Sequence, residues 1–126
     1  MVYMTRTYTR DMTPQGVMKL NRKLNQMKKR IFNKYVDKIC EAYYIDESEL
    51  FAKDKRSDLA DARHLLYYLS LEAPMTIAQL RKYMMDNDYK ISHSTIYHGY
   101  NKIKLLTETN DDIQDIVKSI KKECIN

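Results

Sequence analysis

Four consecutive side chains with hydrogen-bonding groups stand directly ahead of an apolar helical pattern: Ser92, His93, Ser94 and Thr95. Apolar positions from Ile96 to Ile103 recur at spacings of three and four, which predicts a helix with one inward stripe. Ser92 is a suitable N-cap because its hydroxyl can accept a bond from the unpaired amides that follow. Hydroxyl and imidazole groups at such a helix end can contact phosphates or base edges, as the reading helix of a helix-turn-helix does in the major groove.

The charge of the chain is concentrated at one end. Residues 1–34 hold nine of the 22 Lys and Arg residues and a single acidic residue, Asp11. The remaining residues carry slightly more acidic than basic groups, so the formal net charge of +5 conceals a strongly basic first third. A basic arm on a nearly neutral domain is typical of nucleic-acid binding, although a solvated helix face gives the same pattern.

The first third divides into a tail and a helix. Residues 1–12 show no periodicity and read as a flexible basic tail, whereas Thr13-Pro14 has the form of an N-cap followed by proline at the first helical position. Residues 13–34 are therefore expected to form a basic amphipathic helix that continues to about Tyr44. Its apolar positions recur in a heptad-like seam: Val17, Leu20, Leu24, Met27 and Ile31. This seam predicts packing on the domain, or a homodimer or protein partner through residues 17–31.

Residues 35–126 form one predicted domain with no strand candidates. Leu50 and Phe51 are expected to anchor a polar segment. Ser57 is expected to cap the next helix, which buries the side that runs from Leu59 to Leu69. Arg63, His64 and Tyr67 are expected to lie off this buried side. Thr76 and Asn110 are predicted N-caps of two further helices, and residues 86–90 form a turn. The expected fold is an all-α small helical bundle of five to six helices, containing a helix-turn-helix and preceded by the basic helix.

Several classes of function find no support in the sequence. No paired carboxylates, Ser-His-Asp set or Cys-His set has a spacing that suggests catalysis, so the chain is not expected to be an enzyme. Neither Gly16 nor Gly99 lies in a phosphate-cradling P-loop, so no nucleotide or other cofactor is expected. Cys40 and Cys124 share no motif, and His93 and His98 lack the spacing of a helical zinc pair. No apolar run has transmembrane length, which predicts a cytoplasmic protein that does not bind membranes.

Three segments together resemble a known family. They are the segment Val36–Leu50 followed by the basic loop Lys53–Arg56, the run Ala60-Asp-Ala-Arg63 leading into an apolar helix, and the run from Ser92 to Ile103. In the last run a His, a hydroxyl pair, a second His and Lys102-Ile103 all fall in register with the family pattern. Over residues 36 to about 122 the chain is similar to the C-terminal DNA-binding domain of the bacterial replication initiator DnaA, without its ATPase domain.

This resemblance implies binding of double-stranded DNA through two elements. The residues that it assigns to DNA contact are Ser92, His93, Ser94 and Thr95 in the major groove, Lys53, Lys55 and Arg56 at the minor groove, and Arg63 and Lys102 in addition. Two departures put the DNA box of the family in doubt: Ile91-Ser92 replaces an Arg-Asp pair, and Asp61 replaces a residue that is basic in many relatives.

The sequence thus predicts a DNA-binding protein that acts in replication initiation or its regulation, or in transcription control. Abundant Lys, Ile, Asn and Tyr with two Gly and two Pro suggest an AT-rich genome, such as that of a phage or mobile element. The alternative is a structural or interaction protein that keeps the fold and binds a protein partner through the N-terminal seam. The changes at Ile91 and Ser92 favour this alternative, whereas the intact His93–Thr95 run favours DNA.

Overall fold

The computed structural model describes the backbone of residues 14–125 and the side chains of residues 18–124. This part of the chain forms six helices: α1 (Pro14–Tyr43), α2 (Glu47–Leu50), α3 (Ser57–Glu72), α4 (Ile77–Asp86), α5 (His93–Thr109) and α6 (Asp111–Ile125). The predicted all-α fold is confirmed. The predicted tail 1–12 and the predicted cap Thr13 lie outside the described residues.

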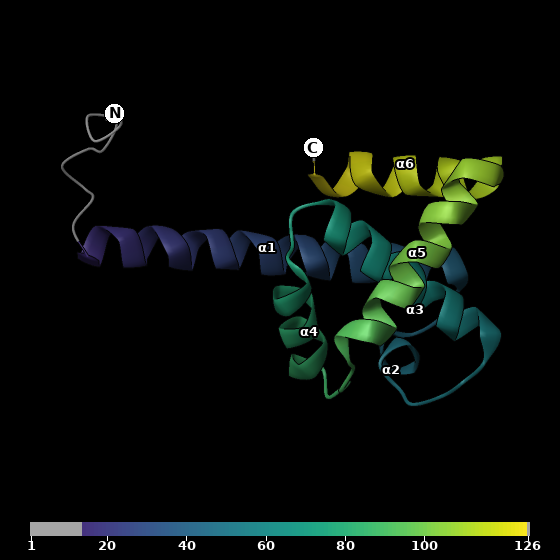
Figure 1. Ribbon diagram of the computed structural model, residues 1–126, viewed down its shortest axis with the longest axis horizontal. Helices are drawn as coiled ribbons and strands as arrows, with labels where there is room; N and C mark the ends of the chain where they lie inside the picture. The colour runs from purple at the N-terminus through teal and green to yellow at the C-terminus, as the bar shows by residue number, and fades with distance from the viewer. Residues whose placement is uncertain (1–13, 126) are drawn as a thin grey trace.

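Helix α1 belongs to the domain over only part of its length. Its C-terminal half contributes Phe32, Tyr35, Val36 and Ile39 to the core, whereas its first turns project from the bundle (Figure 1). Contact with α4 begins near Asn25, whose carbonyl accepts from the Tyr83 hydroxyl at 3.3 Å. The helix is continuous through residues 34 and 35, so the predicted boundary between the basic helix and the domain falls inside one element. The Tyr35 hydroxyl donates a 2.8 Å bond to the carbonyl of Ala73, which fixes α1 to the end of α3.

Helix α3 is the centre of the bundle and packs against α1, α2, α4 and α5 (Figure 1). Because neighbours surround it, its side chains are buried nearly all round, including Arg63 and Tyr67 at 5% and 1% exposure. The expectation that Arg63, His64 and Tyr67 lie off the buried side is therefore wrong, since His64 is also half-buried. The cap was also misplaced: α3 begins at Ser57, its N-cap is Arg56, and no side chain caps it.

Helices α4 and α5 have the N-caps that the sequence predicts. The Thr76 hydroxyl accepts from the amide of Gln79 at 3.2 Å, and the Gln79 side chain accepts from the amide of Thr76, which is a capping box. Residues 87–92 connect the two helices, with Asp88 in the left-handed region at φ 60°. Asn110 accepts from the amides of Asp112 and Ile113 at the start of α6, as expected.

Two further findings concern membrane-spanning helices and metal sites in the described residues. Along the described part of the chain, no helix combines the length and apolarity that crossing a bilayer requires. Among the same residues, His, Cys, Asp and Glu side chains nowhere gather in threes in a way that would hold a metal ion.

Candidate nucleic-acid interface

The first turn of α5 is exposed, while the helix behind it is anchored. Ser92, His93, Ser94 and Thr95, called here the α5 tip, are all exposed, and Ile96, Gly99 and Ile103 are buried against the domain. The Ser92 hydroxyl accepts from the amide of Thr95 at 3.2 Å and lies 2.9 Å from the Thr95 hydroxyl. These two hydroxyls are therefore partly engaged in capping, whereas His93 and Ser94 project from the surface at the positive end of the helix dipole.

The loop before α3 lies on one side of the α5 tip. Lys53 donates a 2.8 Å bond to the carbonyl of Lys90, and its ammonium lies 4.0 Å from the centre of the Tyr89 ring. A cavity of about 300 Å³ opens between this loop, α3 and α5, and Lys53, Lys55 and Thr95 all line it. The structure therefore brings two of the predicted loop residues together with the α5 tip.

Helix α4 supplies basic side chains on the other side of the tip. His93 shares a shallow pocket with Arg81 and Lys82, both of which are exposed. The Arg81 Nε donates a 3.0 Å bond to the carbonyl of Ile91, so the arginine is fixed beside the N-terminus of α5. Nothing in the sequence singled out Arg81 and Lys82 as interface residues. They lie on the predicted helix that precedes the Ser92–Thr95 run, which could have indicated an interface position. The chain has 22 Lys and Arg residues, however, and the sequence does not distinguish these two from the others.

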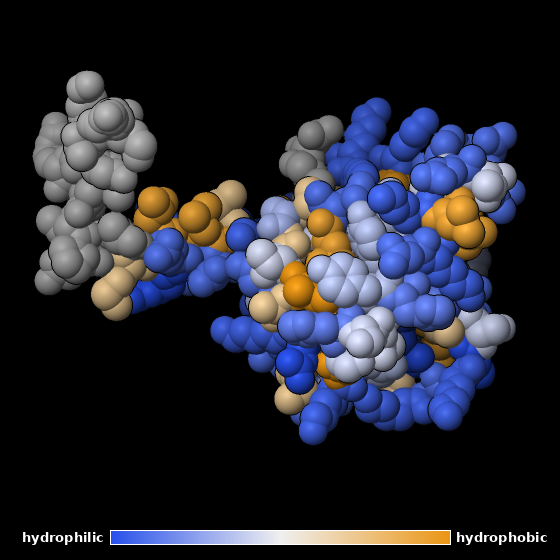
Figure 2. Space-filling view, viewed as in Figure 1, coloured by the Kyte–Doolittle hydropathy of each residue, from blue (hydrophilic) through white to orange (hydrophobic). Residues whose placement is uncertain are grey.

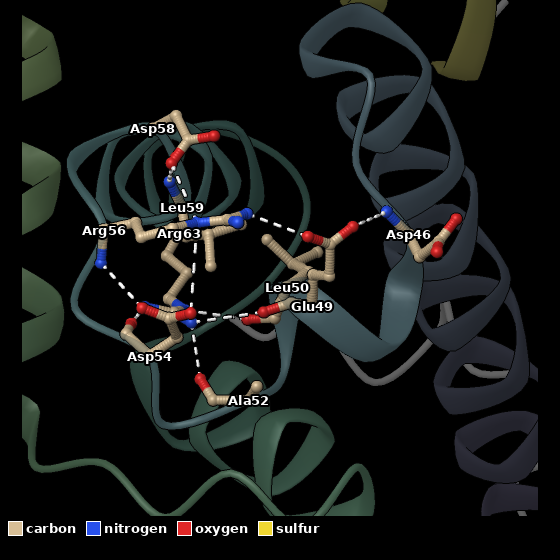
Figure 3. A network of polar contacts seen from close by, with 9 residues as sticks. All are labelled: Asp46, Glu49, Leu50, Ala52, Asp54, Arg56, Asp58, Leu59 and Arg63. Carbon is tan, nitrogen blue, oxygen red and sulfur yellow. Dashed lines mark hydrogen bonds and ion pairs between the residues drawn. The ribbon is translucent and has the colours of Figure 1, made fainter.

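Arg63 has a structural position and not an interfacial one. Its side chain is 5% exposed and runs from α3 into the loop of residues 49–54 (Figure 3). The guanidinium donates to the backbone carbonyls of four residues: Glu49, Leu50, Ala52 and Asp54. The DNA contact that the resemblance assigns to Arg63 is therefore corrected, because the guanidinium nitrogens are already bonded to the loop that carries Lys53 and Lys55.

Arg56 is exposed but engaged in ion pairs. Its guanidinium lies 2.8 Å from a carboxylate oxygen of Glu49 and 3.5 Å from one of Asp58 (Figure 3). Two hydrogen bonds to the Glu49 carboxylate, the stronger effect coming from the Asp46 amide and the weaker from Arg56, hold the pKa of Glu49 below its ordinary value. Glu49 is therefore ionised at neutral pH. The carboxylates around Arg56 compete with any phosphate, and Arg56 does not line the cavity beside the α5 tip.

The contact between α3 and α5 is very close at Gly99. A Cβ atom at this position would lie 2.6 Å from Cδ2 of His64 and 2.9 Å from Cδ2 of Tyr67. The Nδ1 of His64 is buried without a hydrogen-bond partner, and its ring meets that of His98 edge-on with centroids 6.3 Å apart. His98 itself is exposed.

Lys102 lies on α5 seven residues beyond Thr95 and is exposed. Seven residues are almost two helical turns, so Lys102 and Thr95 share one side of α5. Burial lowers the pKa of His64 in α3, and the positive charge of Lys102 lowers it further. Lys102 therefore extends the positive surface along α5 and away from the tip.

Comparisons with models of protein families, with curated proteins and with solved structures found no match for this chain.

Proposed function

We propose that this chain is a double-stranded DNA-binding protein in which α4 and α5 form a helix-turn-helix and the α5 tip enters the major groove. The observation that carries the proposal is the exposed α5 tip with basic side chains on both of its flanks. Arg81 and Lys82 lie on the α4 side, and Lys53 and Lys55 lie on the loop side. The resemblance of the Ser92–Ile103 run to the DnaA C-terminal domain supports the same assignment.

The residues at the tip divide into two roles. His93 and Ser94 have exposed side chains that reach base edges or a thymine methyl group, which is where sequence preference arises. Lys53, Lys55 and Lys82 neutralise phosphates and fix the register of the protein on the duplex. Each phosphate contact releases counterions, so the affinity falls steeply with increasing salt concentration.

The biological setting of this activity is the cytoplasm, at a replication origin or a promoter. The chain binds DNA without nucleotide hydrolysis, and it regulates replication initiation or transcription rather than carrying out a reaction. A phage or mobile element is the source that the composition favours.

The test is selection of binding sites from random DNA duplexes at two salt concentrations with the purified full chain. His93→Ala is the diagnostic variant, and His98→Ala is its matched control because both histidines are exposed on α5. An enriched motif that is retained by His98→Ala and lost or relaxed by His93→Ala is the expected result. Each lost base contact costs about 1–3 kcal/mol of discrimination.

Two results would overturn parts of the proposal. Salt-sensitive binding with no enriched motif would remove sequence reading and leave an architectural protein that contacts only the DNA backbone. Absence of binding to any duplex at low salt would remove the DNA function altogether.

A further inference from the structure

The projecting part of α1 carries an apolar stripe that the domain does not cover. Leu20, Leu24 and Met27 are 51%, 43% and 51% exposed, and Ile31 is half-buried where the stripe reaches the bundle. These four residues are called here the α1 stripe. Hydrophobic side chains gather on the projecting helix in the space-filling view (Figure 2). Large apolar residues clustered on one exposed face mark an interaction surface, in contrast to singly scattered ones.

The α1 stripe continues, at the same spacing of three and four, into a face that already binds a helix. The next positions along it are Lys34 and Lys38. Here α6 lies along α1 and runs in the opposite direction (Figure 1). The Lys38 ammonium lies 3.0 Å from a carboxylate oxygen of Glu123, and the neighbouring Cys124 is buried. This intramolecular contact joins an apolar helix face to α1 and adds a carboxylate that pairs with a lysine of α1.

The charges beside the α1 stripe disfavour a second copy of this chain as its occupant. No Asp or Glu occurs between residues 14 and 34. In a heptad that places the stripe at positions a and d, the flanking positions hold Lys23, Lys28 and Arg30. Pairing two copies in either direction would bring these cations together, and like charges at flanking positions oppose association. Carboxylates at the same positions of a partner would pair with them.

A membrane surface is also a poor fit to the α1 stripe. The stripe is a single row at spacings of three and four, as in a helix–helix seam, without the broad apolar face of a helix that lies in a bilayer interface. In addition, α6 occupies the same side of α1 a few turns further along, so a flat surface that lay on the stripe would meet α6 (Figure 1). A single helix can lie along the stripe and end where α6 ends.

We propose that the α1 stripe binds an amphipathic helix of a partner protein whose apolar seam is flanked by Asp and Glu residues. The partner helix extends the surface that α6 covers, with its carboxylates against Lys23, Lys28 and Arg30 at the flanks of the stripe. The pair of Glu123 with Lys38, which lies in line with the stripe, is the intramolecular precedent for a carboxylate on this side of α1. Binding at this place leaves the α5 tip accessible, so the chain can link an acidic partner to whatever the tip contacts.

The experiment uses two synthetic peptides of three heptads with identical leucine seams and different flanks. One peptide carries Glu at both flanking positions, and the other carries Lys there. Their binding to the full chain is measured by fluorescence anisotropy. The Glu-flanked peptide is expected to bind at least tenfold more tightly than the Lys-flanked one, with an affinity that weakens as salt concentration rises.

The variants test whether the peptide binds at the α1 stripe. Leu24→Asp should abolish binding of the Glu-flanked peptide, whereas Leu105→Asp, which alters an exposed leucine on α5, should leave it unchanged. Leu24 and Leu105 both lie outside the core cluster. Both variants should therefore retain the wild-type circular dichroism spectrum and melting temperature.

Three results would overturn the proposal. Equal binding of the two peptides, or binding unaffected by Leu24→Asp, would show that the α1 stripe does not select an acidic helix. A dimer in sedimentation that Leu24→Asp dissociates would make the second copy the occupant. Cosedimentation with phosphatidylserine–phosphatidylcholine vesicles that is lost in Leu24→Asp, without binding of either peptide, would assign the stripe to a membrane surface.

Discussion

Gly99 of α5 lies directly against the His64 ring of α3, closer than any residue with a β-carbon could lie without displacing that ring. The same ring leaves Nδ1 buried without a partner and meets His98 at its edge. The contact sets the separation of α3 and α5 and therefore the position of the α5 tip relative to Lys53 and Lys55. Two residues behind the tip thus help to fix the geometry of the candidate interface.

Gly99→Ala should destabilise the protein in spite of the higher helix propensity of alanine. The added methyl group must displace the His64 or Tyr67 ring, and overpacking of this kind costs about 1–3 kcal/mol, which outweighs a propensity gain of about 1 kcal/mol at most positions. Urea denaturation measures the change in the free energy of unfolding. Asn101→Ala, at an exposed position of the same helix, is the control and should not lower stability. A Gly99→Ala variant as stable as wild type would show that α3 and α5 separate without cost.

Arg63→Lys should destabilise the domain strongly, although it preserves the charge. A lysine ammonium has no planar fork and cannot reach four carbonyls that diverge around the guanidinium. The carbonyls that remain buried without a donor make the expected loss about 3 kcal/mol. Arg22→Lys on the exposed face of α1 should change the free energy of unfolding by less than about 0.5 kcal/mol. If the two variants are equally stable in denaturation, the loop does not depend on Arg63.

The stability of the protein should fall when the pH is lowered through the range in which histidine titrates. Burial, and after it the charge of Lys102, holds the pKa of His64 below its ordinary value of 6.5. The unfolded chain therefore binds a proton more readily than the folded one, so the contribution of His64 is fully present above 6.5 and is lost as the pH falls below it.

His64→Gln should flatten this pH dependence between about pH 7.5 and 5, where few carboxylates titrate. Chemical denaturation at several pH values in this interval gives the slope. Asn101→Ala serves as the control, since that position is exposed and carries no titratable group. Equal slopes for wild type and His64→Gln would mean that another group causes the loss.

Lys55→Ala should weaken binding to all DNA sequences alike and reduce the salt slope of the affinity by about one. Arg56→Ala should have a smaller effect, because Glu49 and Asp58 already neutralise the guanidinium. Fluorescence anisotropy with one duplex over a range of salt concentrations distinguishes the two variants. A larger effect of Arg56→Ala would indicate that its ion pairs open when DNA binds.

The sequence predicted the helices with the strongest local signals. The spacing of apolar residues located α1, α4, α5 and α6. Thr76, Ser92 and Asn110 cap α4, α5 and α6 as predicted, because their side chains accept hydrogen bonds from the first amides of these helices. Each of these signals depends on residues that are close together in the sequence. A cap is recognised from a few neighbouring residues, and a helix with one buried face is recognised from the spacing of its apolar residues.

The sequence failed where several elements meet. Arg63 read as a surface base because nothing near it in the chain reveals a loop folded back over α3, and the carbonyls that it binds carry no sequence signal. His64 and Tyr67 appeared to lie off the stripe, because a helix packed on several sides has no single period to detect. Arg81 and Lys82 can be placed beside His93 only from the packing of α4 against α5.

The continuity of α1 makes the molecule a rigid spacer. Thirty residues in one unbroken helix span about 45 Å, somewhat more than one turn of duplex DNA. Because the C-terminal half of this helix is embedded in the core through its own Phe32, Tyr35 and Ile39, its free end cannot swing independently of the domain. A partner bound near Leu20, as proposed above, would be held at a set distance and orientation relative to the α5 tip, and a single proline substitution between them would remove that alignment.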